Sequence, residues 1–458
     1  MDQTTFDRIF PQYLLANQGH ARAHHFGKAI YVHPQRFSEG IYLRSDIGTK
    51  LGAVLLNQQP LCDFNNIPYT PTQLTIISEI LRHLIDGELF SGGRDYSLRF
   101  ITGDIGEIRT QKIDGLEKKV LVIPQGLRRA KITAESFATA RMTSHPLCNQ
   151  PKKILESMVK TMANSGFEQS IYHRFTAGGD ATTHGANAKP IINSLVVSST
   201  WQFTSQTPYN LPTHATKMLY ICSQPSNESH FAQLKGTGRY LDRILRLLEV
   251  LDNPQLQEKE INDIAYSTPN GMLADTTYTN LAFAIPHPSK REWTIIAFPN
   301  PIKDNYFFKG KTQATVYELL QKYGAKKQIE PILYTSPKHL ASQLGYTTAI
   351  DGKKLMRKIL FNYVEAMIAP GTFLGPQLVK GIVSSNLKYS KIFDQTSQSA
   401  NATRLILQLY NDVVWGLNGG LPQKDQPCIS SDPNYCTLFD MDQISESNFT
   451  PLHFDSLE

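Results

Sequence analysis

The chain has 458 residues, 41% of them hydrophobic and 19% charged, and its formal net charge is +6. It is too long for one ordinary core and too apolar to be disordered, so we expect a globular protein of two or three domains. Its longest apolar runs fall far short of the ~20 residues of a membrane-spanning helix, which predicts no transmembrane segment.

The cysteines favour a reducing compartment. They are few and odd in number, and no two have the CxxC spacing of a zinc ribbon: Cys62, Cys148, Cys222, Cys428 and Cys436. The first ten residues, MDQTTFDRIF, lack the basic end and apolar core of a secretory signal. We therefore predict a cytoplasmic protein, and the same features would suit a bacterial effector exported without a signal peptide.

Residues 1–150 are predicted to form a sheet-rich N-terminal domain. The segments SLRFITGDIGEIRT (97–110) and KKVLVIPQG (118–126) are typical of antiparallel hairpin strands, with Gly/Asp pairs as turn signals. One amphipathic helix is expected in TPTQLTIISEILRHLIDGE (70–88). This region carries no recognisable chemistry.

Residues 151–345 alternate helices with strands, which predicts a central α/β domain that holds the ligand site. The expected strands include QSIYHRF (169–175), NSLVVSSTW (193–201) and TKMLYICSQ (216–224). The segment KTQATVYELLQKYG is predicted to be a helix that ends at Gly324.

Residues 346–458 are expected to be a helical region with a polar tail. Helices are predicted over 352–371, which ends in Pro370-Gly371, and over 402–420, which ends in a double glycine. The predicted fold class is therefore α+β (mixed α/β), multi-domain, with a central mixed sheet flanked by helices.

Three short motifs of the central region follow one another in an order that suggests a nucleotide site. A strand ends in His173-Arg174, a second strand ends in Ser198-Ser199-Thr200, and QEKEI places Glu258 and Glu260 before a third strand. In this order they resemble the Arg, Ser-Thr-Ser and Glu-x-Glu signature of mono-ADP-ribosyltransferases. Trp201 departs from the signature, because it stands where the family has its second serine.

The resemblance implies an enzyme that transfers ADP-ribose from NAD to a protein acceptor. Arg174 would hold the dinucleotide phosphates as a bidentate fork. Ser199, with Thr200 beside it, would orient the nicotinamide ribose. Glu260 would stabilise the oxocarbenium-like transition state, and Glu258 would activate the acceptor.

A second reading of the same region resembles macrodomains, which bind or hydrolyse ADP-ribose. AGGDATTHGANAKP (177–190) is similar to their glycine loop, with Gly178 and Gly179 against the pyrophosphate. WTIIAFPNP (293–301) is similar to the strand before their second phosphate loop, and Phe307 would stack on the ribose or base. Either resemblance implies NAD or ADP-ribose as the bound nucleotide.

Other candidates are less specific. His20 and His24 have the i, i+4 spacing of helical metal ligands, but no carboxylate or cysteine accompanies them, so a solvated basic loop is the preferred interpretation and no metal is predicted. Basic runs such as KGK (309–311) and KKLMRK (353–358) are scattered and do not predict a nucleic-acid surface. A non-enzymatic protein-interaction module is the remaining alternative.

Overall fold

A computed structural model describes the following parts of the chain: residues 55–56, 59–60, 100–113, 115–139, 147–163, 165, 167–180, 193–202, 215, 217–225, 250, 253–261, 263–276, 279–300, 310–350, 352–371, 375–384, 387–417 and 435–444. The chain divides into two compact units. The first comprises residues 1–208, 234–237 and 423–458, and the second comprises residues 209–233 and 238–422.

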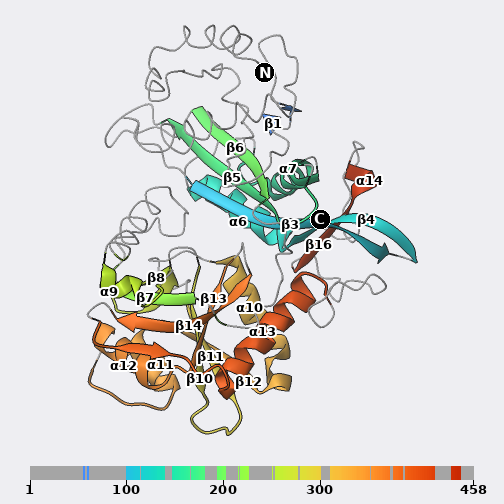
Figure 1. The fold of residues 1–458 in the computed structure, drawn as a ribbon. Coiled ribbons are helices and arrows are strands. Elements are labelled where there is room, and N and C mark those ends of the chain that lie inside the picture. Colours follow the sequence, from blue (N-terminus) through green and yellow to red (C-terminus); the bar gives the residue numbers. More distant parts are fainter. Residues whose placement is uncertain are drawn as a thin grey trace. The chain divides into compact units, whose positions relative to one another are not determined.

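The first unit is built on an antiparallel sheet of five described strands in the order β16-β4-β3-β5-β6 (Figure 1). The strands are β3 (Phe100–Ile113), β4 (Leu116–Pro124), β5 (Ile171–Asp180), β6 (Asn193–Gln202) and β16 (Cys436–Asp440). A separate short ladder joins β1 (Leu55–Leu56) to β2 (Gln59–Pro60).

The hairpin predicted around residues 97–126 is confirmed. Ile113 of β3 pairs with Leu116 of β4, which leaves a two-residue loop that ends in Gly115. The chain's polar tail also contributes to this sheet, because β16 pairs with β4 along its whole length.

The core of the first unit lies between this sheet and two helices. Helices α6 (Gly126–Thr139) and α7 (Pro151–Ala163) pack against each other and against strands β3, β5 and β6, and α14 (Met441–Ile444) packs against α7 and β4. Buried apolar side chains from all these helices and from β3, β4, β5 and β16 meet there, among them Ile123, Phe137, Met158, Phe175 and Phe439.

The second unit contains a curled mixed sheet in the order β12-β11-β10-β13-β14-β7-β8-β9, with β15 added to β14. Three neighbouring pairs are parallel, β11–β12, β14–β7 and β7–β8, and the others are antiparallel. The strands are β7 (Lys217–Pro225), β8 (Asp263–Ser267), β9 (Leu273–Thr276), β10 (Ala282–Pro286), β11 (Thr294–Pro299), β12 (Ile329–Tyr334), β13 (Ala366–Pro370), β14 (Pro376–Ser384) and β15 (Ser390–Ile392).

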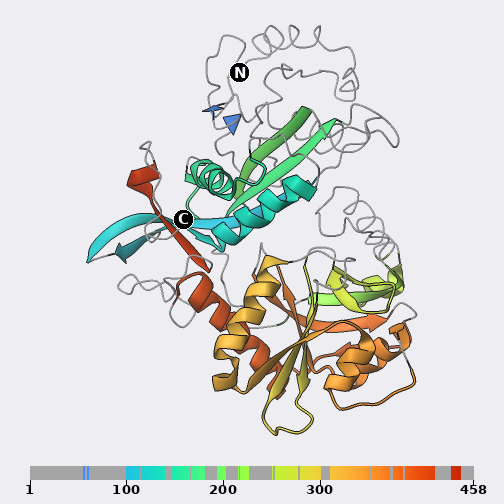
Figure 2. The same cartoon turned by 180° about the vertical axis from the view of Figure 1, so that it is seen from behind.

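Helices cover both faces of this sheet (Figures 1 and 2). Strand alternation sends Ile295 and Ala297 of β11 into a core shared with α11 and α12, whereas Phe298 points to the other face and packs edge-on against Tyr317 of α10. The helices are α9 (Pro254–Gln257), α10 (Lys311–Tyr323) with the 3-10 turn η4 (Gly324–Lys327), α11 (Pro337–Gln343), α12 (Gly352–Asn362) and α13 (Gln398–Val414).

The predicted fold class is confirmed: the protein is a mixed α and β structure with sheets flanked by helices. The helix predicted over 352–371 is wrong in its second half. Helix α12 ends at Asn362, and Ala366–Pro370 form the fully buried strand β13. A short apolar run buried on both faces has no periodicity that separates a strand from a helix.

Candidate functional site

Buried polar residues gather at the start of helix α10 in the second unit. Gly310 occupies the N-cap position in extended conformation and supplies no side-chain hydrogen bond. The first intrahelical bond runs from Ala314 N to Gly310 O at 3.1 Å, so the N–H groups of residues 311–313 lie outside the helical ladder. Together with the helix dipole they make this end of α10 electropositive.

The three residues of this first turn are polar and nevertheless buried. Lys311, Thr312 and Gln313 are 2%, 1% and 4% exposed. The Gln313 side-chain amide donates to Pro299 O at 2.9 Å, which ties the turn to the end of β11. Among the described residues, Thr312 Oγ1 and Gln313 Oε1 have no hydrogen-bond partner. A buried polar atom left unpaired costs about 1–3 kcal/mol, and a bound ligand that pairs with it is one way to offset that cost.

The segment between β9 and β10 packs against this turn. Asn280 lies directly beside Gly310, and a Cβ on that glycine would overlap the Asn280 side-chain oxygen. Asn280 in turn forms a β-bridge with Asp275 of β9, and both residues are buried. A buried amide and a buried carboxylate therefore stand in one chain of contacts with the start of α10.

A third segment, which follows strand β13, contacts the loop between β9 and β10. Thr276 and Thr279 close the loop after β9 through bonds from Thr279 N to Thr276 Oγ1 at 3.0 Å and between the two hydroxyls at 3.1 Å. Gly371, which follows β13, lies so close that a Cβ there would come within 2.6 Å of Thr279 Cγ2. We call residues 275–276, 279–280, 310–313 and Gly371 the α10 cradle.

The α10 cradle has the chemistry of an anion site. A helix N-terminus offers backbone N–H groups, and its dipole favours negative charge, which is how many proteins hold phosphate groups. Thr312 adds a hydroxyl group, and Lys311 is a buried cationic residue of the same turn. The absence of side chains on Gly310 and Gly371 is what lets the three segments approach one another.

The residues predicted from sequence lie elsewhere. Arg174 and Ser199 are opposite each other in the β5–β6 ladder, so the fold does bring their backbones together in the first unit. The structure gives no description of either side chain. Glu258 and Glu260 belong to the second unit, in the turn after α9.

Both glutamates are exposed. Glu260 Oε2 pairs with Lys380 Nζ at 2.7 Å, and the hydrogen bond and charge of Lys380 lower the pKa of the Glu260 carboxyl. This arrangement is that of a solvated surface ion pair.

The remaining predicted positions fall in strands or outside the described residues. Gly178 and Gly179 lie within β5 and pair with Leu195 and Ser194 of β6, so this glycine pair stands in a ladder rather than in a loop. Thr200 is in β6, opposite His173. Phe307, His20 and His24 lie outside the described residues.

Membrane-spanning helices and metal-binding clusters were the remaining features in question. No helix there is long and apolar enough to cross a membrane. No group of three or more His, Cys, Asp and Glu side chains in those parts has the arrangement of a metal site.

Comparison with known proteins finds similarity in structure only. No protein-family model matches this chain, and no curated protein does. The solved structures that match include three branched-chain amino acid aminotransferases. The T.th. enzyme, complexed with N-(5'-phosphopyridoxyl)-L-glutamate, has 14% identity over 68% of this chain and 84% of its own, with a TM-score of 0.46.

The other two have similar values. The enzyme from Thermoproteus uzoniensis has 11% identity over 76% of this chain and 92% of its own, with a TM-score of 0.47. The Escherichia coli enzyme has 13% identity over 72% and 90%, with a TM-score of 0.44.

These matches correct the predicted recognition, function and cofactor. The resemblance to mono-ADP-ribosyltransferases and to macrodomains is wrong, and so is the expectation of NAD or ADP-ribose, because the matching structures are aminotransferases and one is complexed with pyridoxamine 5'-phosphate. The physical reason for the error is that an arginine, a serine and a Glu-x-Glu pair recur in any chain of this size. Here one of those glutamates is an exposed ion-pair partner.

Sequence reasoning missed the α10 cradle. It identified helix 311–324 and the basic run 309–311 separately, and it assigned the run no role. The available signal was a glycine followed by Lys-Thr at the first turn of a helix that comes after a buried strand.

Proposed function

We propose that the second unit binds a phosphorylated cofactor of the pyridoxal phosphate class, with its phosphate in the α10 cradle, and that the protein is an enzyme acting on amino compounds. The observation that carries the proposal is Thr312. This residue is only 1% exposed, and its hydroxyl is unpaired among the described residues, in the electropositive first turn of a 13-residue helix.

The residues present fit such a group. A phosphate would accept from the N–H groups of the first turn of α10 and from Thr312 Oγ1, and the buried Lys311 would balance its charge. Asp275 is a buried carboxylate linked to the start of α10 through Asn280. Enzymes of this class place a charged side chain against the ring nitrogen of the cofactor, and Asp275 supplies one.

The contacts of the cradle indicate what the protein's own residues would do for the bound cofactor. When bound, pyridoxal phosphate supplies an electron sink for bonds at the carbon that carries the amino group. The cradle anchors the phosphate end, and the contact of Asn280 with Gly310 fixes the first turn that holds it. Burial of the whole first turn excludes water, which strengthens each charge-assisted hydrogen bond.

Thermal unfolding of the full chain tests the proposal with three additives: pyridoxal 5'-phosphate, pyridoxal and inorganic phosphate. A ligand at 100 times its dissociation constant stabilises the folded state by about 2.7 kcal/mol. Pyridoxal 5'-phosphate is expected to raise the melting temperature well beyond the other two. Equal shifts with pyridoxal and its phosphate would contradict a phosphate anchor.

A second outcome separates the anion site from the cofactor. A shift with inorganic phosphate but none with pyridoxal 5'-phosphate would leave the cradle as a phosphate site and overturn the cofactor assignment. Because pyridoxal compounds also react with surface lysines, the Thr312→Val variant serves as the control, and it is expected to lose most of the shift at the same ligand concentration.

A further inference from the structure

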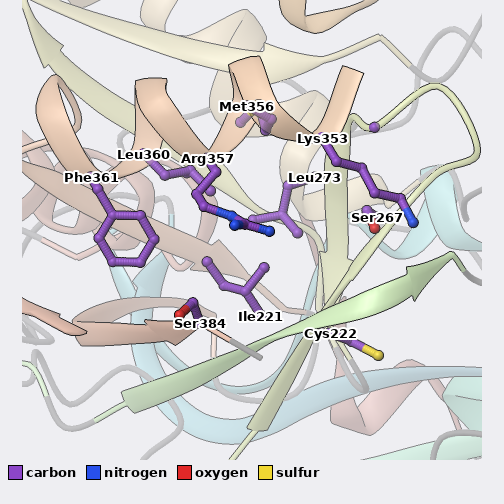
Figure 3. A pocket seen from close by; sticks show the side chains of 11 residues that line it. Ile221, Cys222, Ser267, Leu273, Lys353, Met356, Arg357, Leu360, Phe361 and Ser384 are labelled. Atoms are coloured by element: carbon purple, nitrogen blue, oxygen red, sulfur yellow. The ribbon is translucent and has the colours of Figure 1, made fainter. Parts of the chain in front are cut away.

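A second pocket lies in the second unit, away from the residues of the α10 cradle. Strands β7, β8, β9 and β14 and helix α12 line it, and its volume is about 60 Å³ (Figure 3). None of its lining residues belongs to residues 275–276, 279–280, 310–313 or Gly371. A ligand in this pocket would therefore not be the cofactor molecule whose phosphate lies in the α10 cradle.

Two cations of α12 line this pocket. Lys353 and Arg357 are four residues apart, so they stand on the same face of the helix. Figure 3 shows the Arg357 guanidinium extending over the centre of the pocket, with Lys353 on the side of Ser267. Arg357 makes no ion pair with another residue of the described parts. A cationic pair with this arrangement favours an anionic group between them.

The pocket is also lined by a buried hydroxyl without a partner among the described residues. Ser267, at the end of β8, is 6% exposed, and its Oγ has no hydrogen-bond partner among the described residues. This hydroxyl lines the pocket together with Lys353 and Arg357. An acceptor atom placed in the pocket would satisfy it.

The turn that carries Ser267 is fixed in place. Thr268 N donates to Met272 O at 2.8 Å, and Gly271 N donates to Thr268 O at 2.9 Å. Gly271 has a φ of +85° and packs against the backbone of Lys353, so only glycine fits there. The turn and the first residues of α12 therefore hold Ser267 and Lys353 in a set relation, without help from a ligand.

The rest of the wall is apolar. Ile221 of β7, Leu273 of β9 and Leu360 and Phe361 of α12 supply it. A cavity of about 150 Å³ takes benzene, so the buried part of an occupant here is limited to a few heavy atoms. A small pocket with a cationic side, one hydroxyl donor and a hydrocarbon wall matches a short organic acid better than it matches inorganic phosphate, whose oxygens would face the apolar side chains unpaired.

We propose that this pocket is a binding site for a small monocarboxylate with a short hydrocarbon chain. Its carboxylate accepts from Arg357, Lys353 and Ser267, and its chain packs on Ile221, Leu273 and Phe361. The site is independent of the proposed cofactor site, since the two share no residue.

The test uses butanoate as the probe and butanamide as its uncharged counterpart, each added to the full chain at matched ionic strength. Thermal unfolding is measured for the wild type and for Arg357→Gln, Ser267→Ala and Lys358→Gln. Lys358 is exposed on the same helix and does not line the pocket, so its variant controls for loss of one positive charge.

Butanoate is expected to stabilise the wild type and the Lys358→Gln variant, and butanamide is expected to stabilise neither. Arg357→Gln should weaken butanoate binding by about tenfold or more, because it removes a charge-assisted hydrogen bond. Ser267→Ala should weaken it while leaving the unliganded melting temperature unchanged or raised, since it removes an unpaired buried hydroxyl. This variant keeps the test valid should Arg357→Gln fold poorly.

Three results would overturn the proposal: no stabilisation of the wild type by butanoate, an equal effect of butanamide, or a butanoate effect that survives Arg357→Gln. An equal effect of inorganic phosphate would also overturn it, as a general salt effect. The Thr312→Val variant should keep its response to butanoate, so failure of this site and failure of the cofactor site are distinguishable.

Discussion

The side-chain oxygen of Asn280 occupies the space that a Cβ on Gly310, the N-cap residue of helix α10, would need. This contact joins the loop after β9 to the helix N-terminus and leaves no space for a side chain at position 310. The contact between Gly310 and the Asn280 side chain therefore helps to fix the position of the electropositive first turn of α10.

Replacing Gly310 by alanine should destabilise the protein by about 1–3 kcal/mol, the usual cost of overpacking a close contact. Urea unfolding of the variant measures the change in the free energy of unfolding. Adding Asn280→Ala removes the overlapped side chain, and the double variant should recover part of the loss. Additive effects of the two substitutions would show that the contact does not constrain the turn.

The Thr312→Val substitution removes the unpaired hydroxyl and keeps the side-chain shape. It should leave the free energy of unfolding unchanged or slightly higher, because the hydroxyl has no partner among the described residues. Binding of pyridoxal 5'-phosphate should weaken by about 1.5–3 kcal/mol, the worth of a hydrogen bond to a charged group. Titration calorimetry measures this directly, and unchanged affinity would place the phosphate elsewhere.

The Lys217–Asp263 ion pair is predicted to be a strong structural contact of the second unit. Lys217 Nζ lies 2.7 Å from Asp263 Oδ2, and the two side chains are 11% and 0% exposed. Lys217→Met should cost about 3–5 kcal/mol, because it leaves a buried carboxylate without its counter-charge. Addition of Asp263→Asn should recover stability. The exposed pair of Lys380 and Glu260 is the control, and Lys380→Met should change stability little.

A small loss on Lys217→Met, no larger than that of Lys380→Met, would show that water reaches Asp263 in solution. The comparison is matched, since each variant removes one lysine from an ion pair of the same length, 2.7 Å.

His173 makes the stability of the first unit depend on pH. Its ring is fully buried against Phe175, and burial lowers its pKa from 6.5 to about 3. In the folded state it stays neutral, whereas in the unfolded chain it takes up a proton below pH 6.5. Its contribution to stability is therefore complete above pH 6.5 and is lost as the pH falls towards 3, at about 1.4 kcal/mol per pH unit.

The His173→Gln variant separates this titration from packing. Lost packing costs the same at every pH, so the stability difference between wild type and variant should shrink between pH 6 and pH 4. Chemical denaturation at several pH values measures it. A difference that is constant with pH would mean that His173 is protonated in the folded protein. Asp104, the buried residue opposite it in the β3–β5 ladder, is the group that would favour such a proton.

Much of the local structure could be predicted from the sequence. Helix α10 was expected over 311–324 and runs from Lys311 to Tyr323, because its apolar spacing and the following glycine both mark it. The β3–β4 hairpin was expected from its strands and its Asp-Gly turn. Strand β13 was not, because its five buried residues carry no alternation.

The candidate site could not be predicted from the sequence, for a different reason. Lys311 and Thr312 are polar residues that a sequence places on a surface, yet both are buried in the folded chain, next to the Gly310 that Asn280 contacts. Likewise, nothing local to Ser267 distinguishes its hydroxyl from an exposed one. Whether distant segments bury a polar group depends on tertiary packing, which the order of residues does not give. One of the motifs chosen from residue order contains Glu260, which forms an ion pair exposed to solvent.

A crystal structure of the full chain with pyridoxal 5'-phosphate would test the central claim most directly. We predict the phosphate at the first turn of α10, within hydrogen-bond distance of Thr312 Oγ1 and of the N–H groups that precede Ala314. A phosphate bound elsewhere, with the Thr312 hydroxyl still unpaired, would contradict it.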